Sequence, residues 1–315
     1  MRILVTGGAG FVGSHLCARL LERQHEVIVL DNFLTGNRRN LPEPDASVSY
    51  RLVEADVTQP FDVCVDAIFH LASPASPSGY VEHPLETALA NSIGTYNALR
   101  LAEKYSAQFL LASTSEVYGD PLEHPQREEY WGNANPVGLR SCYEEGKRFA
   151  ETLTMIFERS HGLDARIVRI FNCYGPNSDP DDGRLVPNFV KQALKGDPIT
   201  VYGTGEHTRS ICYVSDLVEG LLKAMFTQGS RGRIYNLGSQ DEHKVNEYAS
   251  VIKRLAESKS PIVHLDPKFE DDPRRRRPDI TRAKQELGWA PVVEMEEGLR
   301  NTIEWFRVLM SYEDR

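Results

Sequence analysis

The fold of this chain is decided near its start, where residues 3–13 read ILVTGGAGFVG. A short apolar run, typical of a buried strand, leads into a glycine-rich turn and then into a helical pattern. The turn matches the dinucleotide fingerprint Gly-x-Gly-x-x-Gly and its short-chain variant. Such a turn brings backbone N–H groups and the start of a helix close to a pyrophosphate. The stretch predicts a dinucleotide site with contacts from Gly7, Gly10, Phe11, Val12 and Gly13.

An acidic residue lies where a dinucleotide site needs one. Asp31 closes the next apolar run, 18 positions after Gly13. A carboxylate at this point hydrogen-bonds both ribose hydroxyls of NAD and repels the 2′-phosphate of NADP, so the sequence predicts NAD as the cofactor. Two alternatives stay open: Arg38 and Arg39 are near enough in sequence to reach a 2′-phosphate, and Asp31 is also a residue type that caps turns. Further cofactor contacts are expected at Asn32 and, near the adenine, at Asp56 and Val57.

Strand and helix patterns alternate through the first half of the chain. This alternation predicts an α/β fold of the Rossmann type, with a doubly wound parallel sheet. Past residue 175 glycine and proline become frequent, and we expect a smaller C-terminal α/β lobe there. The predicted domains are therefore residues 1–175 and residues 176–315, with later segments interleaved. Strands are expected at 2–5, 27–30, 48–53, 67–71, 108–112 and 166–171, and helices at 11–23, 84–105, 139–161, 246–256 and 296–310.

Composition and charge exclude several classes of protein. The 315 residues carry 36 Lys and Arg against 45 Asp and Glu, a net charge of −9, which disfavours nucleic acid and anionic membranes as partners. No apolar run approaches the roughly 18 residues of a membrane span, and residue 2 already begins a predicted strand, so we expect a cytoplasmic protein. The five cysteines form no Cys-x-x-Cys pair, which favours structural thiols and predicts neither a metal site nor disulfides.

A tyrosine and a lysine stand at i and i+4 on one predicted helix. Tyr143 and Lys147 therefore share a helix face. A nearby ammonium stabilises a phenolate, so we expect the pKa of Tyr143 to fall from about 10 toward neutrality. Such a tyrosine takes a proton from a substrate hydroxyl while NAD accepts a hydride from the same carbon.

A Ser/Thr-rich stretch ends the predicted strand at 108–112. Residues at the carboxyl ends of parallel strands face the ligand crevice of a doubly wound sheet. Thr114 is placed to donate a hydrogen bond to a developing carbonyl oxygen, and Glu116 to act as an acid or a base. The alternative is that residues 113–115 only cap a helix or form a turn.

Longer motifs carry a resemblance that spans nearly the whole chain. The chain resembles the extended short-chain dehydrogenase/reductases that act on nucleotide sugars, and within them it is most similar to the UDP-glucuronate decarboxylases. The motifs are HLASPASP (70–77), LASTSEVYGDP (111–121), YWGN (130–133), CYEEGKR (142–148), RIFNCYGP (169–176), TRSICYVSD (208–216) and RRPDI (276–280).

The resemblance implies a carboxy-lyase that converts UDP-glucuronate to UDP-xylose. NAD-dependent oxidation at C4 makes a β-keto acid, which loses CO2 before C4 is reduced again. The resemblance places Tyr143 and Lys147 in both redox steps, Ser115 and Glu116 where the sugar is oriented, and Arg276 near the substrate carboxylate. It also implies a homodimer through the helices at 84–105 and 139–161, with Ala88, Leu89, Ser92 and Tyr96 as one candidate face. It adds Leu71 and Ala72 to the cofactor contacts. It also implies UDP-sugar contacts, with the UDP moiety in the second lobe, from Pro74, Tyr80, Asn172, Asn188, Phe189, Tyr202, Arg209 and Arg276.

Other functions stay open at this point. Nucleotide-sugar 4,6-dehydratases resemble this chain but carry an acidic residue at the position of Ser115, and 4-epimerases usually lack a carboxylate at the position of Glu116. A decarboxylase that releases the 4-keto pentose has the same residues. A protein of another class, an NAD-sensing binder, has no need of the Thr114, Tyr143 and Lys147 set. The arginines at 274–277 are otherwise expected on a solvated surface.

Overall fold

The computed structural model describes residues 1–42, 50–266 and 275–313. In this part of the chain seven strands form one parallel sheet in the order β11-β6-β5-β4-β1-β2-β3. The predicted α/β fold of the Rossmann type is thereby confirmed; residues 48–49 of one expected strand lie outside the described ranges. The strands are β1 (Arg2–Thr6), β2 (Glu26–Asp31), β3 (Tyr50–Glu54), β4 (Ala67–His70), β5 (Gln108–Thr114), β6 (Ala165–Ile170) and β11 (Ile234–Leu237).

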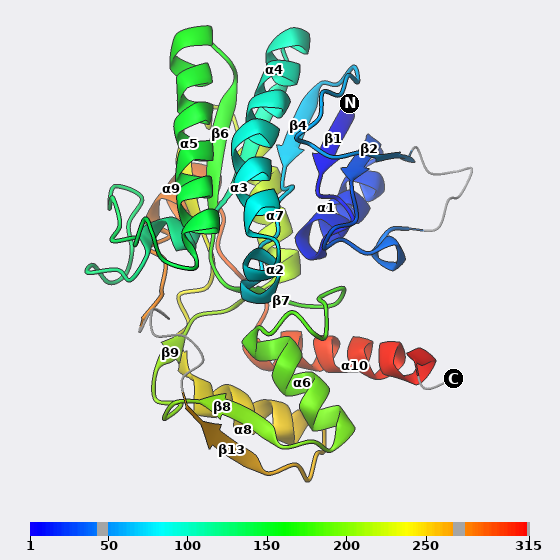
Figure 1. Cartoon of the computed structure of the whole chain (residues 1–315), viewed down its shortest axis with the longest axis vertical. Helices are drawn as coiled ribbons and strands as arrows, with labels where there is room; N and C mark the ends of the chain where they lie inside the picture. The colour runs from blue at the N-terminus through cyan, green and yellow to red at the C-terminus, as the bar shows by residue number, and fades with distance from the viewer. Residues whose placement is uncertain (43–49, 267–274, 314–315) are drawn as a thin grey trace.

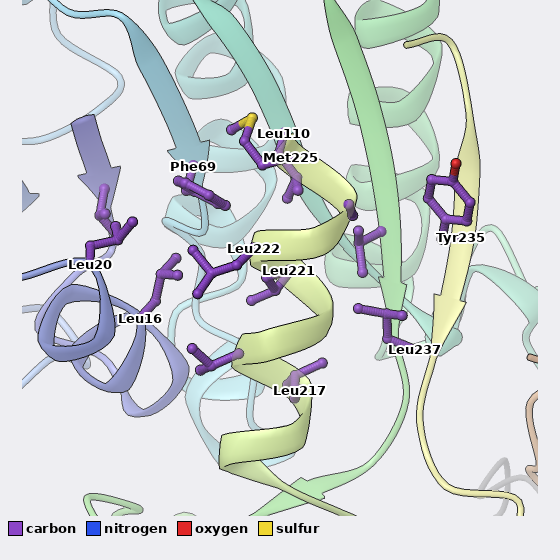
Figure 2. Close-up of a cluster of buried hydrophobic side chains, with 14 of the residues drawn as sticks. Leu16, Leu20, Phe69, Leu110, Leu217, Leu221, Leu222, Met225, Tyr235 and Leu237 are labelled. Atoms are coloured by element: carbon purple, nitrogen blue, oxygen red, sulfur yellow. The ribbon is translucent and has the colours of Figure 1, made fainter. Parts of the chain in front are cut away.

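Helices cover both faces of the sheet because its strands are apolar on both sides. Along β1, Ile3 and Val5 belong to one hydrophobic cluster, whereas Leu4 belongs to the other. Figure 2 shows the first cluster, where leucines of α7 such as Leu217 and Leu221 pack toward the sheet. The helices of that face are α1 (Phe11–Glu22), α7 (Val214–Phe226) and α9 (Thr281–Leu287); the other face carries α3 (Pro84–Leu89), the π-turn η2 (Ala90–Gly94), α4 (Thr95–Tyr105) and α5 (Ser141–His161).

A smaller lobe lies beyond the carboxyl ends of the strands (Figure 1). Its three long helices pack around a third hydrophobic cluster with a parallel strand pair. The helices are α6 (Leu185–Lys195), α8 (Val245–Leu255) and α10 (Met295–Glu313), and the pair is β8 (Ile199–Tyr202) with β13 (Ile262–Leu265). Two short pairs join the lobes: β7 (Cys173–Tyr174) with β10 (Cys212–Tyr213), and β9 (Thr208–Arg209) with β12 (His243–Lys244).

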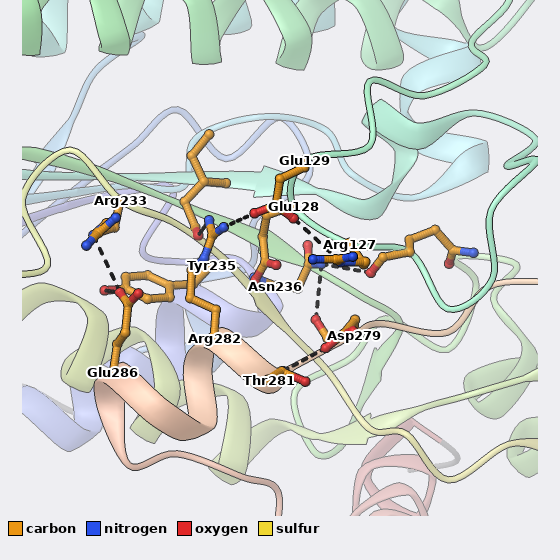
Figure 3. Close-up of polar contacts among 12 residues, drawn as sticks. Arg127, Glu128, Glu129, Arg233, Tyr235, Asn236, Asp279, Thr281, Arg282 and Glu286 are labelled. Carbon is orange, nitrogen blue, oxygen red and sulfur yellow. Dashed lines mark hydrogen bonds and ion pairs between the residues drawn. The ribbon is translucent and has the colours of Figure 1, made fainter.

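The chain returns to the sheet after it has entered the smaller lobe. α7 and β11 follow α6 in sequence but pack on the large sheet, and α9 follows them there. The sequence did not predict β11, because its four residues include a polar Asn236, nor α6, α7 and α9. Polar contacts tie α9 down (Figure 3): Arg282 pairs with Glu129, and Arg233 lies 3.5 Å from Glu286. No helix in the described ranges is both long and apolar enough to span a bilayer.

Candidate active site

A cavity of about 1070 Å³ opens at the carboxyl ends of the strands, lined by both the sheet and the smaller lobe. Residues from the ends of β1, β2, β4, β5 and β6 meet there with residues of α5, α6 and β8. All the residues that the sequence named for cofactor, catalysis and substrate line this one cavity. Segments as far apart as residues 7 and 276 therefore share a single site.

The glycine turn after β1 is closed too tightly for side chains. Gly7 has φ +71°, and a Cβ on Gly13 would lie only 2.2 Å from the Gly7 carbonyl oxygen. Gly10 is the N-cap residue of α1 and has no side chain to occupy the helix start. The first-turn N–H groups of α1 therefore border the cavity and fit a pyrophosphate, which also gains from the positive end of the helix dipole.

Asp31 lies at the end of β2 and borders the same cavity. Its two carboxylate oxygens accept hydrogen bonds from the backbone N–H of Ala9 (2.9 Å) and of Phe33 (2.8 Å). Burial raises the pKa of Asp31, and these two N–H groups oppose the rise. Each oxygen keeps a further lone pair, so the carboxylate fits a ribose diol.

Arg38 and Arg39, which the sequence left as possible contacts to the 2′-phosphate of NADP, lie in different surroundings. Arg38 is paired with Glu54 and stacked 4.2 Å over the Phe33 ring. Arg39 lines the cavity. Near them, the Asn32 amide donates to the Asp56 carboxylate at 3.2 Å, which joins two of the expected cofactor contacts.

Tyr143 and Lys147 lie on the first turns of α5, beside the end of β5. A hydrogen bond joins the Tyr143 and Thr114 side chains. The Lys147 ammonium donates to the Ala112 carbonyl at 2.9 Å and lies 5.9 Å from the centre of the Tyr143 ring. Thr114 also caps a turn, because its hydroxyl accepts from the Glu116 backbone N–H at 3.2 Å. Thr114 therefore has the capping role of the alternative interpretation, and it also borders the cavity, where the predicted hydrogen bond to a substrate oxygen would form.

The expected fall in the pKa of Tyr143 is wrong for the protein by itself. Burial raises the pKa of Tyr143 to about 12, although the hydrogen bond with Thr114 opposes the rise. Burial also lowers the pKa of Lys147 to about 7, against the attraction of Glu151. The helix spacing accounts for the attraction of an ammonium but not for the cost of removing both charged forms from water. Burial thus brings the pKa of Lys147 into the neutral range, so Tyr143 lies beside a group that can exchange protons there.

Glu116 is held between two buried guanidinium groups. Arg276 pairs with both of its oxygens, one of them at 3.1 Å from Nη2, and Arg140 pairs with Oε2. Burial alone would raise the pKa of Glu116, but Arg276 and Arg140 hold it at about 2. In this arrangement the ionised Glu116 carboxylate has no proton to donate as an acid, and its low pKa makes it a weak base.

Arg276 reaches this position through backbone pairing of its own segment. The N–H of Gln126 donates to the Arg277 carbonyl at 2.9 Å, and the N–H of Asp279 donates to the Gln126 carbonyl at 2.8 Å. The buried Asn236 amide donates to the carbonyls of Gln126 (3.1 Å) and Asp279 (3.3 Å). Of the arginine run, Arg274 lies outside the described residues. Arg276 is only 6% exposed, which excludes the surface interpretation for that residue.

On the substrate side an aromatic ring lies against the tyrosine of α5. Tyr80, on α2 (Pro77–Glu82), stacks on Tyr143 with ring centres 5.1 Å apart and planes 7° apart. The Asn188 amide donates to Thr200 at 3.3 Å, and Arg184, which the sequence gave no signal for, lines the cavity 2.9 Å from Asp182. The other expected substrate contacts also border the cavity: Pro74, Asn172, Phe189, Tyr202 and Arg209.

Arg140 is a second site residue that sequence reasoning missed. It precedes Tyr143 by three positions, so it shares that residue's helix face, and this spacing was the available signal. From sequence alone, an arginine just before a helix is expected on the surface. Its role in the site becomes visible only with its carboxylate partner, Glu116, which lies 24 positions away in the sequence.

The family model described as "NAD dependent epimerase/dehydratase family" matches residues 3–238. The chain belongs to this family. Membership confirms NAD as the cofactor. UDP-glucuronic acid decarboxylase 1 of Danio rerio is 52% identical over 305 residues, which cover 97% of this chain and 72% of that protein. The resemblance to the UDP-glucuronate decarboxylases is thereby confirmed.

Solved structures of other members share the fold. UDP-glucose 4-epimerase of Thermotoga maritima, solved with UDP-glucose, has a TM-score of 0.89 and 32% identity, covering 98% of this chain and 100% of that one. UDP-glucuronic acid 4-epimerase of Bacillus cereus, in complex with UDP-glucuronic acid and NAD, has a TM-score of 0.86 and 26% identity over the same shares of the two chains.

Proposed function

We propose that this protein is an NAD-dependent UDP-glucuronate decarboxylase that forms UDP-xylose. The observation that carries the proposal is the pairing of Glu116 with Arg276 in the cavity that also holds Tyr143 and Thr114. Redox chemistry at C4 needs only the Tyr143 and Lys147 set, whereas an arginine beside that set supplies a cation for a sugar carboxylate. The 52% identity to a UDP-glucuronic acid decarboxylase supports the same substrate.

The cofactor is held by the glycine turn and Asp31. NAD held there would supply the hydride acceptor for oxidation at C4 and, as NADH, the hydride donor for the later reduction. Tyr143 takes the proton of the C4 hydroxyl, Lys147 exchanges that proton near neutral pH, and Thr114 donates a hydrogen bond to the new C4 oxygen. Asn188, Phe189, Tyr202 and Arg209 bind the UDP portion in the smaller lobe, where Arg209 supplies positive charge to the diphosphate.

Decarboxylation then follows from the position of the ketone. The C5–C6 bond breaks, CO2 leaves, and the electron pair enters the C4 ketone as an enolate that is protonated at C5. Arg276 binds the substrate carboxylate. An ionised Glu116 close to that carboxylate favours its departure as neutral CO2, because like charges held together repel. A 4,6-dehydratase needs an acid at this place, and neither Ser115 nor a carboxylate with a pKa of about 2 supplies one.

The test is incubation of the purified chain with UDP-glucuronate and NAD while CO2 and the nucleotide sugar are followed together. CO2 with UDP-xylose and no net NADH supports the complete cycle. CO2 with a keto pentose and accumulating NADH identifies the variant that releases its intermediate. Inversion at C4 without CO2 identifies the second candidate, a UDP-glucuronate 4-epimerase, which the Bacillus cereus structure favours. NAD binding without turnover of the nucleotide sugar would support the remaining alternative, an NAD-sensing binder.

We also propose that the protein is a homodimer. Large apolar side chains are exposed along the neighbouring helices α3, α4 and α5, including Leu85 (65%), Tyr96 (47%) and Phe149 (49%). Of the face expected from sequence, Leu89 instead lines the cavity. A dimer mass by light scattering, converted to a monomer mass by Phe149→Glu, is the expected result. A wild-type monomer would refute it.

We further propose that the chain divides into an NAD-binding domain (1–175) and a nucleotide-sugar-binding lobe (176–315), with later segments interleaved. The separate third hydrophobic cluster of the smaller lobe supports this division.

We propose a cytoplasmic location as well. All five cysteines are free, as is usual where thiols are kept reduced. Fractionation of cells that express the tagged full-length chain would test the location.

A further inference from the structure

Arg140 belongs to a buried line of alternating charges at the edge of the cavity. The line runs from Arg276 through Glu116 and Arg140 to Glu144. The Arg140 side chain is 7% exposed, and its Nε lies 3.2 Å from Glu144 Oε1, one turn further along α5. Two cations face two carboxylates in a place where water is largely excluded, so removal of any one leaves a buried charge without its full partner.

The two arginines that hold Glu116 differ in how they are anchored. Arg276 comes from a segment 160 positions away and binds Glu116 through two nitrogens. Arg140 stands directly before α5, three residues from Tyr143, and is fixed on its other side by Glu144. A substrate carboxylate that binds Arg276 competes with Glu116 for that guanidinium. Arg140 remains in place, because its second partner, Glu144, lies on the first turn of the helix that Arg140 directly precedes.

We propose that Arg140 is a positioning residue for decarboxylation, which holds Glu116 charge-paired and in place while Arg276 binds the substrate carboxylate. This inference rests on the proposed decarboxylase function. It explains why one carboxylate carries two guanidinium partners: with substrate bound, three carboxylates would share two arginines, and each arginine would still contact two of them.

The surroundings of Glu116 predict how the reaction responds to pH. Arg276 and Arg140 lower the pKa of Glu116, while Tyr80 of α2 and Tyr143 of α5 face it as neutral phenols. Loss of Arg140 removes one cation, and burial then raises the pKa of Glu116 toward the working range. At acidic pH Glu116 would be protonated, and CO2 loss would slow. The acid limb of the CO2-release rate is therefore expected to move to higher pH.

The experiment compares Arg140→Gln, Arg140→Lys and wild type in single turnovers with UDP-glucuronate and saturating NAD. We expect Arg140→Gln to slow CO2 release by more than about tenfold and C4 oxidation by less than about threefold, so that NADH accumulates. Its acid limb moves to higher pH, and Arg140→Lys, which keeps the charge, moves it less. Arg148→Gln is the matched control, because Arg148 lies on the same helix but donates to the carbonyls of Val117 and Trp131.

Clear outcomes overturn the inference. Equal losses of oxidation and CO2 release with an unmoved acid limb would make Arg140 merely structural, and unchanged CO2 release would remove its role. If Arg140→Gln does not fold, the same comparison of Arg140→Lys with wild type decides. Wild-type protein that releases no CO2 refutes the proposed function itself, whereas wild-type CO2 release with an unaffected variant refutes only the role of Arg140.

Discussion

The cofactor side of the cavity (Gly7, Gly10, Gly13 and Asp31) and its reacting side (Thr114, Glu116, Arg140, Tyr143 and Arg276) are built in different ways. The cofactor side is made within the first 31 residues, largely from backbone and from the lack of side chains. The reacting side is made from side chains as far apart in sequence as residues 114 and 276, and its charged members balance one another. Shape constrains the first side, and electrostatics constrain the second.

Tyr143→Phe should have the largest effect on activity. It should impair the reacting side of the cavity and leave the cofactor side intact. Loss of the hydroxyl removes the proton-transfer group, so we expect turnover to fall by about 10³-fold. NAD affinity should stay within about threefold. CO2 release and calorimetric NAD titration measure the two quantities. The control is Tyr105→Phe, because Tyr105 is a half-buried tyrosine whose hydroxyl donates to Asp62 and which does not line the cavity. An equal loss of NAD binding would mean that the two sides are not independent.

Gly13→Ala tests the steric rule of the cofactor side. The added Cβ would lie 2.2 Å from the Gly7 carbonyl oxygen, so the turn must move. We expect the free energy of unfolding to fall by about 1–3 kcal/mol and NAD binding to weaken by about a hundredfold. Denaturant unfolding and NAD titration check both. A variant of unchanged stability would show that the turn tolerates a side chain.

Asp31→Ala should have a smaller effect, confined to the cofactor. Loss of the ribose contact is expected to weaken NAD by about tenfold, which corresponds to about 1.4 kcal/mol, and to narrow its advantage over NADP. Asp31→Asn is the matched variant, since it keeps the shape and removes the charge. Asp31→Asn should increase the affinity for NADP by a larger factor than it decreases the affinity for NAD. Unchanged NAD affinity in Asp31→Ala would contradict the contact.

Arg38→Gln should have the smallest effect. Because Arg38 is paired with Glu54 and stacked on Phe33, we expect the affinities for NAD and for NADP each to change by less than about twofold. Fluorescence titrations with NAD and with NADP measure the two affinities. A large loss of NADP binding would show that Arg38 reaches a 2′-phosphate after all.

The same contrast explains what could be predicted from the sequence. The glycine turn and the strands around it were predictable because each feature is local: spacing fixes the turn, and apolar runs fix the strands. Glu116 was noticed from its position after a predicted strand, and Arg276 was noticed from the resemblance, so they were predicted only as separate residues. Their ion pair was not predictable, because it depends on Gln126 pairing with the segment of residues 277–279. Arg140 and the raised pKa of Tyr143 depend on burial, which single residues in a sequence do not reveal.

The late position of β11 and α7 in the chain has a consequence for biosynthesis. Until residue 237 has left the ribosome, β6 has no neighbour on its outer side, and the apolar face of α1 around Leu16 lacks its cover of α7 leucines. An open strand edge beside an uncovered apolar surface is a place where nascent chains associate. We therefore expect a fragment that ends at residue 175, which lacks both β11 and α7, to aggregate instead of binding NAD.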